Sequence, residues 1–194
     1  MIRSILFLLG ILIYSGEVYA AERKTSNTIY SIRALGFTHH IVDINYNAEY
    51  FPLKLEQSAT HIFNPGILIG IDKPLNEKDL FWRTVQAIYI DCAIQPAAYI
   101  GTMLFKQPMF KHQYVSLGFG FGFGANIRRS WARYDKPGIQ TRFLKNWGAM
   151  EGIIGPYSEI EFAFQTKNRK QVVLNFVPAF PALVFLTAGY RFNG

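Results

Sequence analysis

Hydrophobic and polar residues alternate along several segments of the chain. In the stretch IVDINYNAEY, from residue 41 to residue 50, Val42, Ile44 and Tyr46 fall on one parity. Asp43 and Glu49 fall on the other. Because successive side chains of a β-strand point to opposite faces, the stretch predicts a strand with one apolar face and one acidic face.

The clearest alternation is in the segment SLGFGFGFGANI, residues 116–127. The residues on one face are Gly118, Gly120, Gly122 and Gly124, and those between them are Phe119, Phe121 and Phe123. Four glycines would weaken a solvent-facing strand without providing a compensating contact. In a small closed barrel they leave room for bulky neighbours or for a ligand. We expect the glycines to face a closed interior and the phenylalanines to face outward, toward lipid.

Nine segments are candidate strands. They lie near residues 28–36, 41–51, 62–72, 81–92, 97–106, 113–127, 154–166, 170–180 and 182–192. Bacterial outer-membrane barrels have even strand numbers, and segment 28–36 has the weakest alternation. The pattern therefore predicts an all-β fold, a single antiparallel up-and-down transmembrane β-barrel of eight strands.

Charged residues on the polar strand faces are expected inside this barrel. They are Asp43, Glu49, Glu159, Glu161 and Arg191. Small eight-stranded barrels are filled by side chains, and buried charges must be paired. These residues therefore predict a structural plug of ion pairs and hydrogen bonds.

Two other folds remain open. A soluble secreted barrel or sandwich also alternates, with its apolar face turned inward. The uncharged segment 172–190 is nearly long enough to be a membrane helix, but Pro178 and Pro181 would break it.

The N-terminal segment and the composition favour an exported barrel. Arg3, an apolar run and small Ala20 predict a signal peptide at residues 1–20 and a barrel at 21–194. The alternative is an uncut membrane anchor helix, but the apolar run is shorter than the ~20 residues that a membrane span needs. The chain contains 17 Phe, 11 Tyr and 16 Gly but only one cysteine, so an internal disulfide is excluded. The final strand, FLTAGYRF, resembles the C-terminal signal by which the barrel assembly machinery recognises outer-membrane barrels.

Segment 128–152 predicts a large, basic, exposed loop in a chain of net charge +7. Its basic residues are Arg128, Arg129, Arg133, Lys136, Arg142 and Lys145. Arginine binds phosphate through paired hydrogen bonds, so we expect contact with lipopolysaccharide phosphates. A solvated loop without a ligand is the alternative. Nucleic acid is not expected as the partner of an exported protein.

Catalytic candidates are few. His39, His40 and His61 are possible general bases, and Asp91 precedes the single cysteine, Cys92, which is expected to be a buried apolar residue. The histidines lack metal-ligand spacing, and no phosphate-binding glycine loop is present. We therefore expect no metal and no cofactor.

The segments IDCAIQPAAYIG, SLGFGFGFGANI and FLTAGYRF together resemble the lipid A palmitoyltransferase of Gram-negative outer membranes. That family is an eight-stranded barrel with an interior acyl-chain pocket and a His, an Asp and a Ser at its outer end. The resemblance implies that Asp91 stands at the family's Asp, with His39, His40 or His61 as the histidine. Cys92 stands where the family has its serine.

The sequence therefore leaves three hypotheses for a barrel of the outer membrane. The first is a non-enzymatic barrel that stabilises the envelope or binds lipid, lipopolysaccharide or a surface partner. The second is a lipid A-modifying acyltransferase or deacylase with an interior tunnel beside the glycine row. The third, a narrow pore, is disfavoured because eight strands leave little lumen.

Overall fold

The computed structural model describes residues 28–40, 52–56, 60–75, 79–112, 114–130, 144–146, 148–166, 170–179 and 183–193. These residues form nine β-strands. In this part of the chain no helix is long and apolar enough to cross a membrane. The candidate membrane helix at 172–190 is instead the two strands β8 and β9.

The strands follow one another in chain order. Their bounds are β1 Ile29–His40, β2 His61–Pro74, β3 Leu80–Ile90, β4 Pro96–Lys111, β5 Val115–Arg129, β6 Leu144–Asn146, β7 Met150–Gln165, β8 Gln171–Ala179 and β9 Leu183–Asn193.

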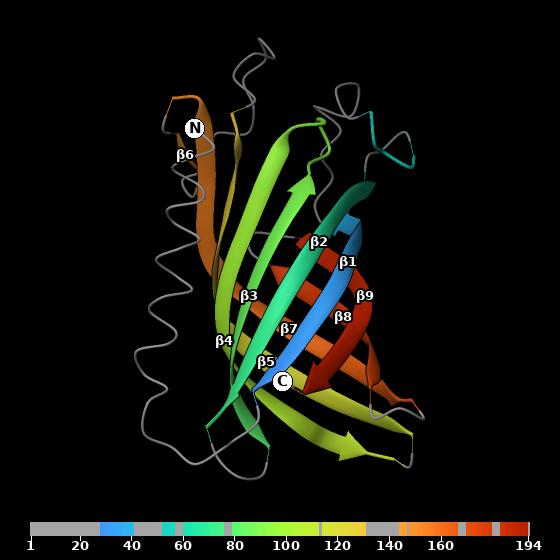
Figure 1. The fold of residues 1–194 in the computed structure, drawn as a ribbon. Coiled ribbons are helices and arrows are strands. Elements are labelled where there is room, and N and C mark those ends of the chain that lie inside the picture. Colours follow the sequence, from blue (N-terminus) through green and yellow to red (C-terminus); the bar gives the residue numbers. More distant parts are fainter. Residues whose placement is uncertain are drawn as a thin grey trace.

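Eight of these strands close into a barrel (Figure 1). Strands β1 to β5 pair in sequence, β5 pairs with β7, and β7, β8 and β9 lead back to β1. Every pairing is antiparallel. The short β6 is outside the ring and pairs with the first residues of β7. The predicted eight-stranded antiparallel barrel is confirmed, and its closure removes the open sheet edges that favour aggregation.

The barrel has two rims that differ in the length of their connections. At the lower rim β1 begins and β9 ends, and neighbouring strands are joined by residues 75–79, 112–114 and 166–170. At the upper rim the connections are residues 41–60, 91–95, 130–149 and 180–182. The two long connections therefore both leave the upper rim.

Two strand predictions were wrong in detail, and a third is not tested. Segment 28–36, judged the weakest, is the core of β1 and pairs along its length with both β2 and β9. The strand predicted at 41–51, with Asp43 and Glu49, lies outside the described residues. Strand β7 begins at Met150, inside the segment predicted as a loop, because its first residues pair with the upper end of β5.

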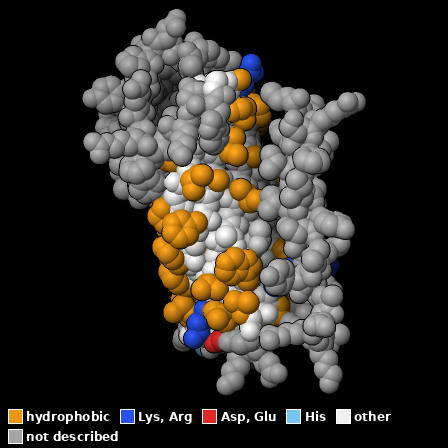
Figure 2. All heavy atoms as spheres, turned by 90° about the vertical axis from the view of Figure 1, so that its left-hand side faces the viewer, with side chains coloured by type: hydrophobic (Ala, Val, Ile, Leu, Met, Phe, Trp, Pro, Cys, Tyr) orange, Lys and Arg blue, Asp and Glu red, His pale blue; other side chains and the backbone are white. Residues whose placement is uncertain are grey.

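The two faces of β5 differ as their alternation predicts. Gly118, Gly120 and Gly122 are buried, whereas Phe121 and Phe123 are 55% and 61% exposed. Figure 2 shows hydrophobic side chains along the height of one side of the barrel, with charged side chains at its two ends. The outer wall is therefore apolar between two charged ends on this side.

Bulky neighbours fill the space beside the glycine row. A Cβ atom at Gly118 would meet the ring of Phe105, one at Gly120 would meet the sulfur of Met103, and one at Gly124 would meet the hydroxyl of Tyr99. Phe105 and Met103 are fully buried and belong to the hydrophobic core. The glycines were expected to leave room either for bulky neighbours or for a ligand, and in the structure bulky side chains occupy that room.

We predict that Gly122→Ala destabilises the barrel by about 1–3 kcal/mol, the usual cost of overpacking a core. The new methyl group would overlap the carbonyl oxygen of Thr102 and the Cα of Met103, and backbone atoms cannot move aside cheaply. The measurement is the free energy of unfolding in urea.

The matched control is Gly36→Ala, because a Cβ at Gly36 has no atom within 4 Å. Equal unfolding free energies for the two variants would show that the β4–β5 contact is looser than the structure indicates.

Candidate functional site

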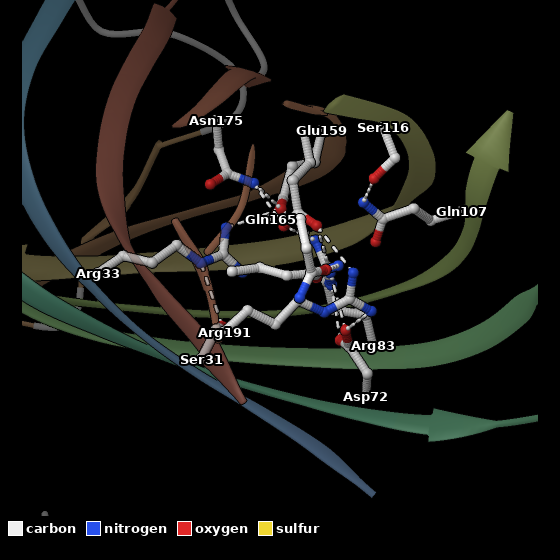
Figure 3. Close-up of polar contacts among 12 residues, drawn as sticks. Ser31, Arg33, Asp72, Arg83, Gln107, Ser116, Glu159, Gln165, Asn175 and Arg191 are labelled. Atoms are coloured by element: carbon white, nitrogen blue, oxygen red, sulfur yellow. Dashed lines mark hydrogen bonds and ion pairs between the residues drawn. The ribbon is translucent and has the colours of Figure 1, made fainter. Parts of the chain in front are cut away.

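The lower half of the lumen contains a network of buried ion pairs centred on Arg83 (Figure 3). Its guanidinium donates two hydrogen bonds to Asp72, Nε to Oδ1 at 2.6 Å and Nη2 to Oδ2 at 2.8 Å. Nη1 also donates to Glu161 Oε2 at 2.9 Å and to Glu159. The guanidinium carbon lies 3.5 Å from the centre of the Phe105 ring. One arginine therefore joins carboxylates from β2 and β7.

Two more arginines complete the network. Arg33 on β1 donates to Glu159 Oε1 at 2.7 Å. Arg191 on β9 donates to Asp72 at 2.8 Å and to Glu161 at 3.1 Å. Each of the six side chains of the network is at most 4% exposed. The three arginines and three carboxylates of the network balance in charge, as buried ions require.

The structure thus places Glu159, Glu161 and Arg191 inside the barrel, where strand parity put them. Sequence analysis missed Asp72, Arg83 and Arg33. Strand parity groups Arg83 with Val85 and Ala87 on one face of β3, and Arg33 with Ser31 and Leu35 on one face of β1. All of these residues are buried, so this grouping is the signal that could have identified the two arginines.

The interior acyl pocket implied by the enzyme hypothesis is not found among the described residues. Above the ion network, the free space beside Tyr99 and Tyr157 is about 30 Å³, roughly the volume of one water molecule in the liquid. The tunnel expected beside Gly118, Gly120, Gly122 and Gly124 is filled by side chains.

Asp91 organises the turn between β3 and β4. Its Oδ1 accepts hydrogen bonds from the backbone N–H groups of Ala93, at 3.0 Å, and Gln95, at 2.7 Å. Cys92 is buried in this turn, and burial raises the pKa of its thiol. The predicted strand 81–92 was too long, since β3 ends at Ile90. Cys92 is therefore buried by the turn and not by strand parity.

The basic residues of the upper rim are only partly described. Arg128 Nε donates to Glu151 Oε1 at 2.7 Å across the β5–β7 pair. Arg129 is exposed at the end of β5. Arg133, Lys136 and Arg142 lie outside the described residues, and the side chain of Lys145 in β6 is not described.

Two of the predicted histidines meet on the outer wall of the barrel at its upper rim. His39 on β1 and His61 on β2 face each other as strand partners, and His39 Nδ1 lies 3.1 Å from His61 Nε2. Nδ1 of His61 lies 2.6 Å from Glu56 Oε1. The result is a hydrogen-bonded chain from Glu56 through His61 to His39. The side chain of His40 is not described.

Glu56 reaches His61 because residues 52–56 form a short arm beside the start of β2. Leu55 N donates to the carbonyl of His61, and Phe63 N donates to the carbonyl of Leu53, both at 2.9 Å. A bridge between Lys54 and Ile62 continues the sheet. The alternation of the sequence gives no signal for this arm.

An apolar groove of about 370 Å³ lies beside this chain of polar groups. Its lining residues come from the arm, β1, β2, β8 and β9, and they are Phe37, Thr38, His39, Leu55, Glu56, His61, Phe176, Val184 and Leu186. Among the described residues, no cluster of His, Cys, Asp and Glu is arranged to hold a metal ion. The groove therefore joins an apolar surface to two imidazoles and a carboxylate.

The fold is that of known outer-membrane barrels. Neisserial surface protein A superposes with a TM-score of 0.55 at 12% identity, covering 89% of this chain and 100% of that one. Ail, the attachment invasion locus protein of Yersinia pestis, gives a TM-score of 0.45 at 14% identity over 87% of this chain and all of Ail. A second Ail structure, in complex with the heparin analogue sucrose octasulfate, gives 0.44 at 12% identity over 86% of this chain and 98% of Ail.

No protein-family model matches the chain, and no curated protein is significantly similar to it in sequence. The similarity to Neisserial surface protein A establishes the barrel fold. The resemblance of three segments to the lipid A palmitoyltransferase stays a prediction.

We predict that Arg83→Met lowers the free energy of unfolding by about 3–5 kcal/mol, the usual cost of removing one partner from a buried ion pair. Asp72, Glu159 and Glu161 would then share two arginines, and the methionine would leave Asp72 short of its bidentate partner.

The control is Lys106→Met, which removes a surface ion pair with Asp79 at 3.5 Å in which the lysine is 54% exposed. Exposed pairs contribute about 0–1 kcal/mol. Both values come from urea unfolding, and similar losses for the two variants would contradict a buried network that holds the lumen together.

Proposed function

We propose that this chain is a small outer-membrane protein whose barrel is inserted in the lipid bilayer and whose upper rim binds lipopolysaccharide. The observation that carries the proposal is the outward belt of exposed apolar side chains around a lumen that contains a network of paired charges. A water-soluble barrel would have the opposite arrangement, with its apolar face inside.

The belt runs around the barrel. Its members on the strands include Ile32, Ile67, Ile69, Ile88, Leu104, Phe119, Phe121, Phe123, Ile154, Phe176 and Tyr190, each more than a third exposed. Soluble monomers rarely expose contiguous apolar patches larger than a few hundred Å². In a bilayer the same belt lies in hydrocarbon, and closure of the sheet pairs each strand with a neighbour on both sides and so avoids an open edge there.

The two rims differ in a way that supports an orientation with the lower rim on the periplasmic side, and exposed aromatic residues near the lower rim support insertion in a membrane. Tyr30, Trp82 and Tyr114 are exposed close to the ends of β1, β3 and β5. Such residues form the interfacial girdles of membrane barrels. Short turns at this rim are typical of the periplasmic side, and the long connections at the other rim are typical of the extracellular side.

The contents of the lumen argue against a pore. Asp72, Arg83, Glu161 and Arg191 hold one another across the barrel from β2, β3, β7 and β9. Ion passage would require these buried pairs to separate, and breaking such a pair is costly. A role at the membrane surface is therefore favoured over conduction.

The upper rim supplies the basic group for this role. Arg129 is exposed there, and an exposed guanidinium can bind a phosphate through two hydrogen bonds. Arg128 is engaged with Glu151, so we assign the larger contribution to Arg129 and to the basic residues that follow it in the chain. The name of Neisserial surface protein A agrees with a location at the cell surface.

The same proposal includes the route to the membrane. Residues 1–20 would be removed as a signal peptide, and the terminal strand β9 would be the signal for the barrel assembly machinery. Within β9, Tyr190 is exposed on the outer wall and Phe192 is partly exposed.

We predict that Phe121→Arg prevents stable insertion, because an arginine on the lipid face costs about 2–4 kcal/mol at the membrane midplane. Phe121 lies in the middle of β5, on its exposed face. The measurement is the free energy of folding into phospholipid vesicles, together with fractionation of cells that express the variant.

Leu75→Arg is the control, because Leu75 is also an exposed apolar residue but lies at the lower turn, where the same change costs about 0–1 kcal/mol. If the two variants fold and fractionate alike, the outer wall does not face lipid and the membrane assignment is wrong.

We predict that Arg129→Ala reduces the amount of lipopolysaccharide that copurifies with the barrel, because it removes an exposed guanidinium at the extracellular rim. Lys170→Ala is the charge-matched control at the lower rim. Phosphate analysis of the purified proteins measures the retained lipid. An equal loss in both variants would indicate nonspecific charge attraction.

A further inference from the structure

We infer that Glu56, His61 and His39, together with the adjoining groove, form a hydrolytic site for an acyl ester of lipopolysaccharide. The inference depends on the membrane insertion proposed above but not on phosphate binding by Arg129. Its first support is the direction in which hydrogen bonds are donated from His39 to His61 and from His61 to Glu56.

An ionised carboxylate only accepts hydrogen bonds, so Nδ1 of His61 carries the proton that bonds Glu56. In a neutral imidazole the other nitrogen is then an acceptor. Nε2 of His61 accepts from Nδ1 of His39, and this leaves the lone pair of His39 on its own Nε2. The chain therefore fixes both tautomers and presents a basic nitrogen at its end, as a carboxylate does for the histidine of a catalytic triad.

The groove is placed to receive one acyl chain. Phe37, Val184 and Leu186 line it on the outward face of β1 and β9, continuous with the belt that faces lipid. His39 is the strand partner of Val184, and Phe37 is the strand partner of Leu186. An acyl chain lying on Leu186 and Phe176 would therefore bring the group above it to His39. The volume of about 370 Å³ is within the usual range of ligand sites, ~300–1,000 Å³.

The charge of the site selects an ester over a phosphate. A carboxylate at the Glu56 position disfavours a second anion beside it, whereas an ester carbonyl is neutral. Because the groove lies at the upper rim, where the long connections leave the barrel, it opens toward the outer leaflet. In an outer membrane the ester-linked lipid of that leaflet is lipopolysaccharide.

The reaction is hydrolysis by water. Nε2 of His39 takes a proton from a water molecule while the water oxygen bonds to the ester carbonyl carbon. The tetrahedral intermediate then collapses, the bond from that carbon to the alkoxy oxygen breaks, and the alkoxy oxygen takes the proton from His39. A fatty acid and an alcohol leave, and nothing is oxidised or reduced. His39 is the catalytic residue, and His61 and Glu56 position it.

The test uses the full barrel in vesicles that contain lipopolysaccharide, with released fatty acid measured by mass spectrometry. His39→Ala is expected to lower the rate about 100-fold or more, within the range of general-base catalysis, and added imidazole is expected to restore part of it. Glu56→Gln is expected to lower kcat more than it changes KM, since the carboxylate acts on the ester through its hydrogen bond to His61. Val184→Trp is expected to raise KM by filling the groove.

His112→Ala is the matched control, since His112 is an exposed histidine at the lower rim, and it should retain the full rate. Protease protection of the same vesicles shows whether the barrel is inserted, which separates a failure of this inference from a failure of membrane insertion. An inserted barrel that releases no fatty acid, releases it only from phospholipid vesicles, or keeps its rate in His39→Ala would overturn the inference.

Discussion

Charge neutrality in a narrow lumen is the constraint on which the rest of this barrel depends. An eight-stranded barrel has an interior that side chains must fill, and ionised groups there are stable only when paired. Arg83 meets this requirement by bonding carboxylates from β2 and β7 at once. The lower half of the interior is consequently filled by polar and charged side chains. The apolar residues of the same strands divide between the hydrophobic core inside the barrel, such as Met103 and Phe105, and the exposed outer wall.

The alternation of residues predicted this division because a strand has a fixed period of two. It placed Glu159, Glu161 and Gly120 on the inner face correctly, using no information beyond the chain itself. The alternation of β1 changes phase partway along, so this segment was the weakest of the predicted strands. Arg33 lies in it and was therefore not among the residues expected in the interior.

The outer-wall groove could not be predicted in the same way. Its chain of polar groups joins Glu56 of the arm to His61, and His61 to His39 through strand pairing across 22 positions. Neither the position of the arm nor the register of the strands follows from a local pattern. His39 and His40 were candidates because they lie close in sequence to Asp43, and His61 and Asp91 because of a family resemblance. Asp91 has its Oδ1 bonded to the backbone of its own turn.

A single extra residue in β1 decides which side of the wall the histidine faces. Leu35 lies opposite Thr187 and Phe37 lies opposite Leu186, so Gly36 is an additional residue between consecutive partners on β9. Such a bulge reverses the alternation that follows it. Without it, His39 would continue the inward series of Arg33 and Leu35 and would lie in the lumen. With it, Thr38 is buried instead, and the imidazole of His39 lies on the outer wall, beside His61 and over the groove.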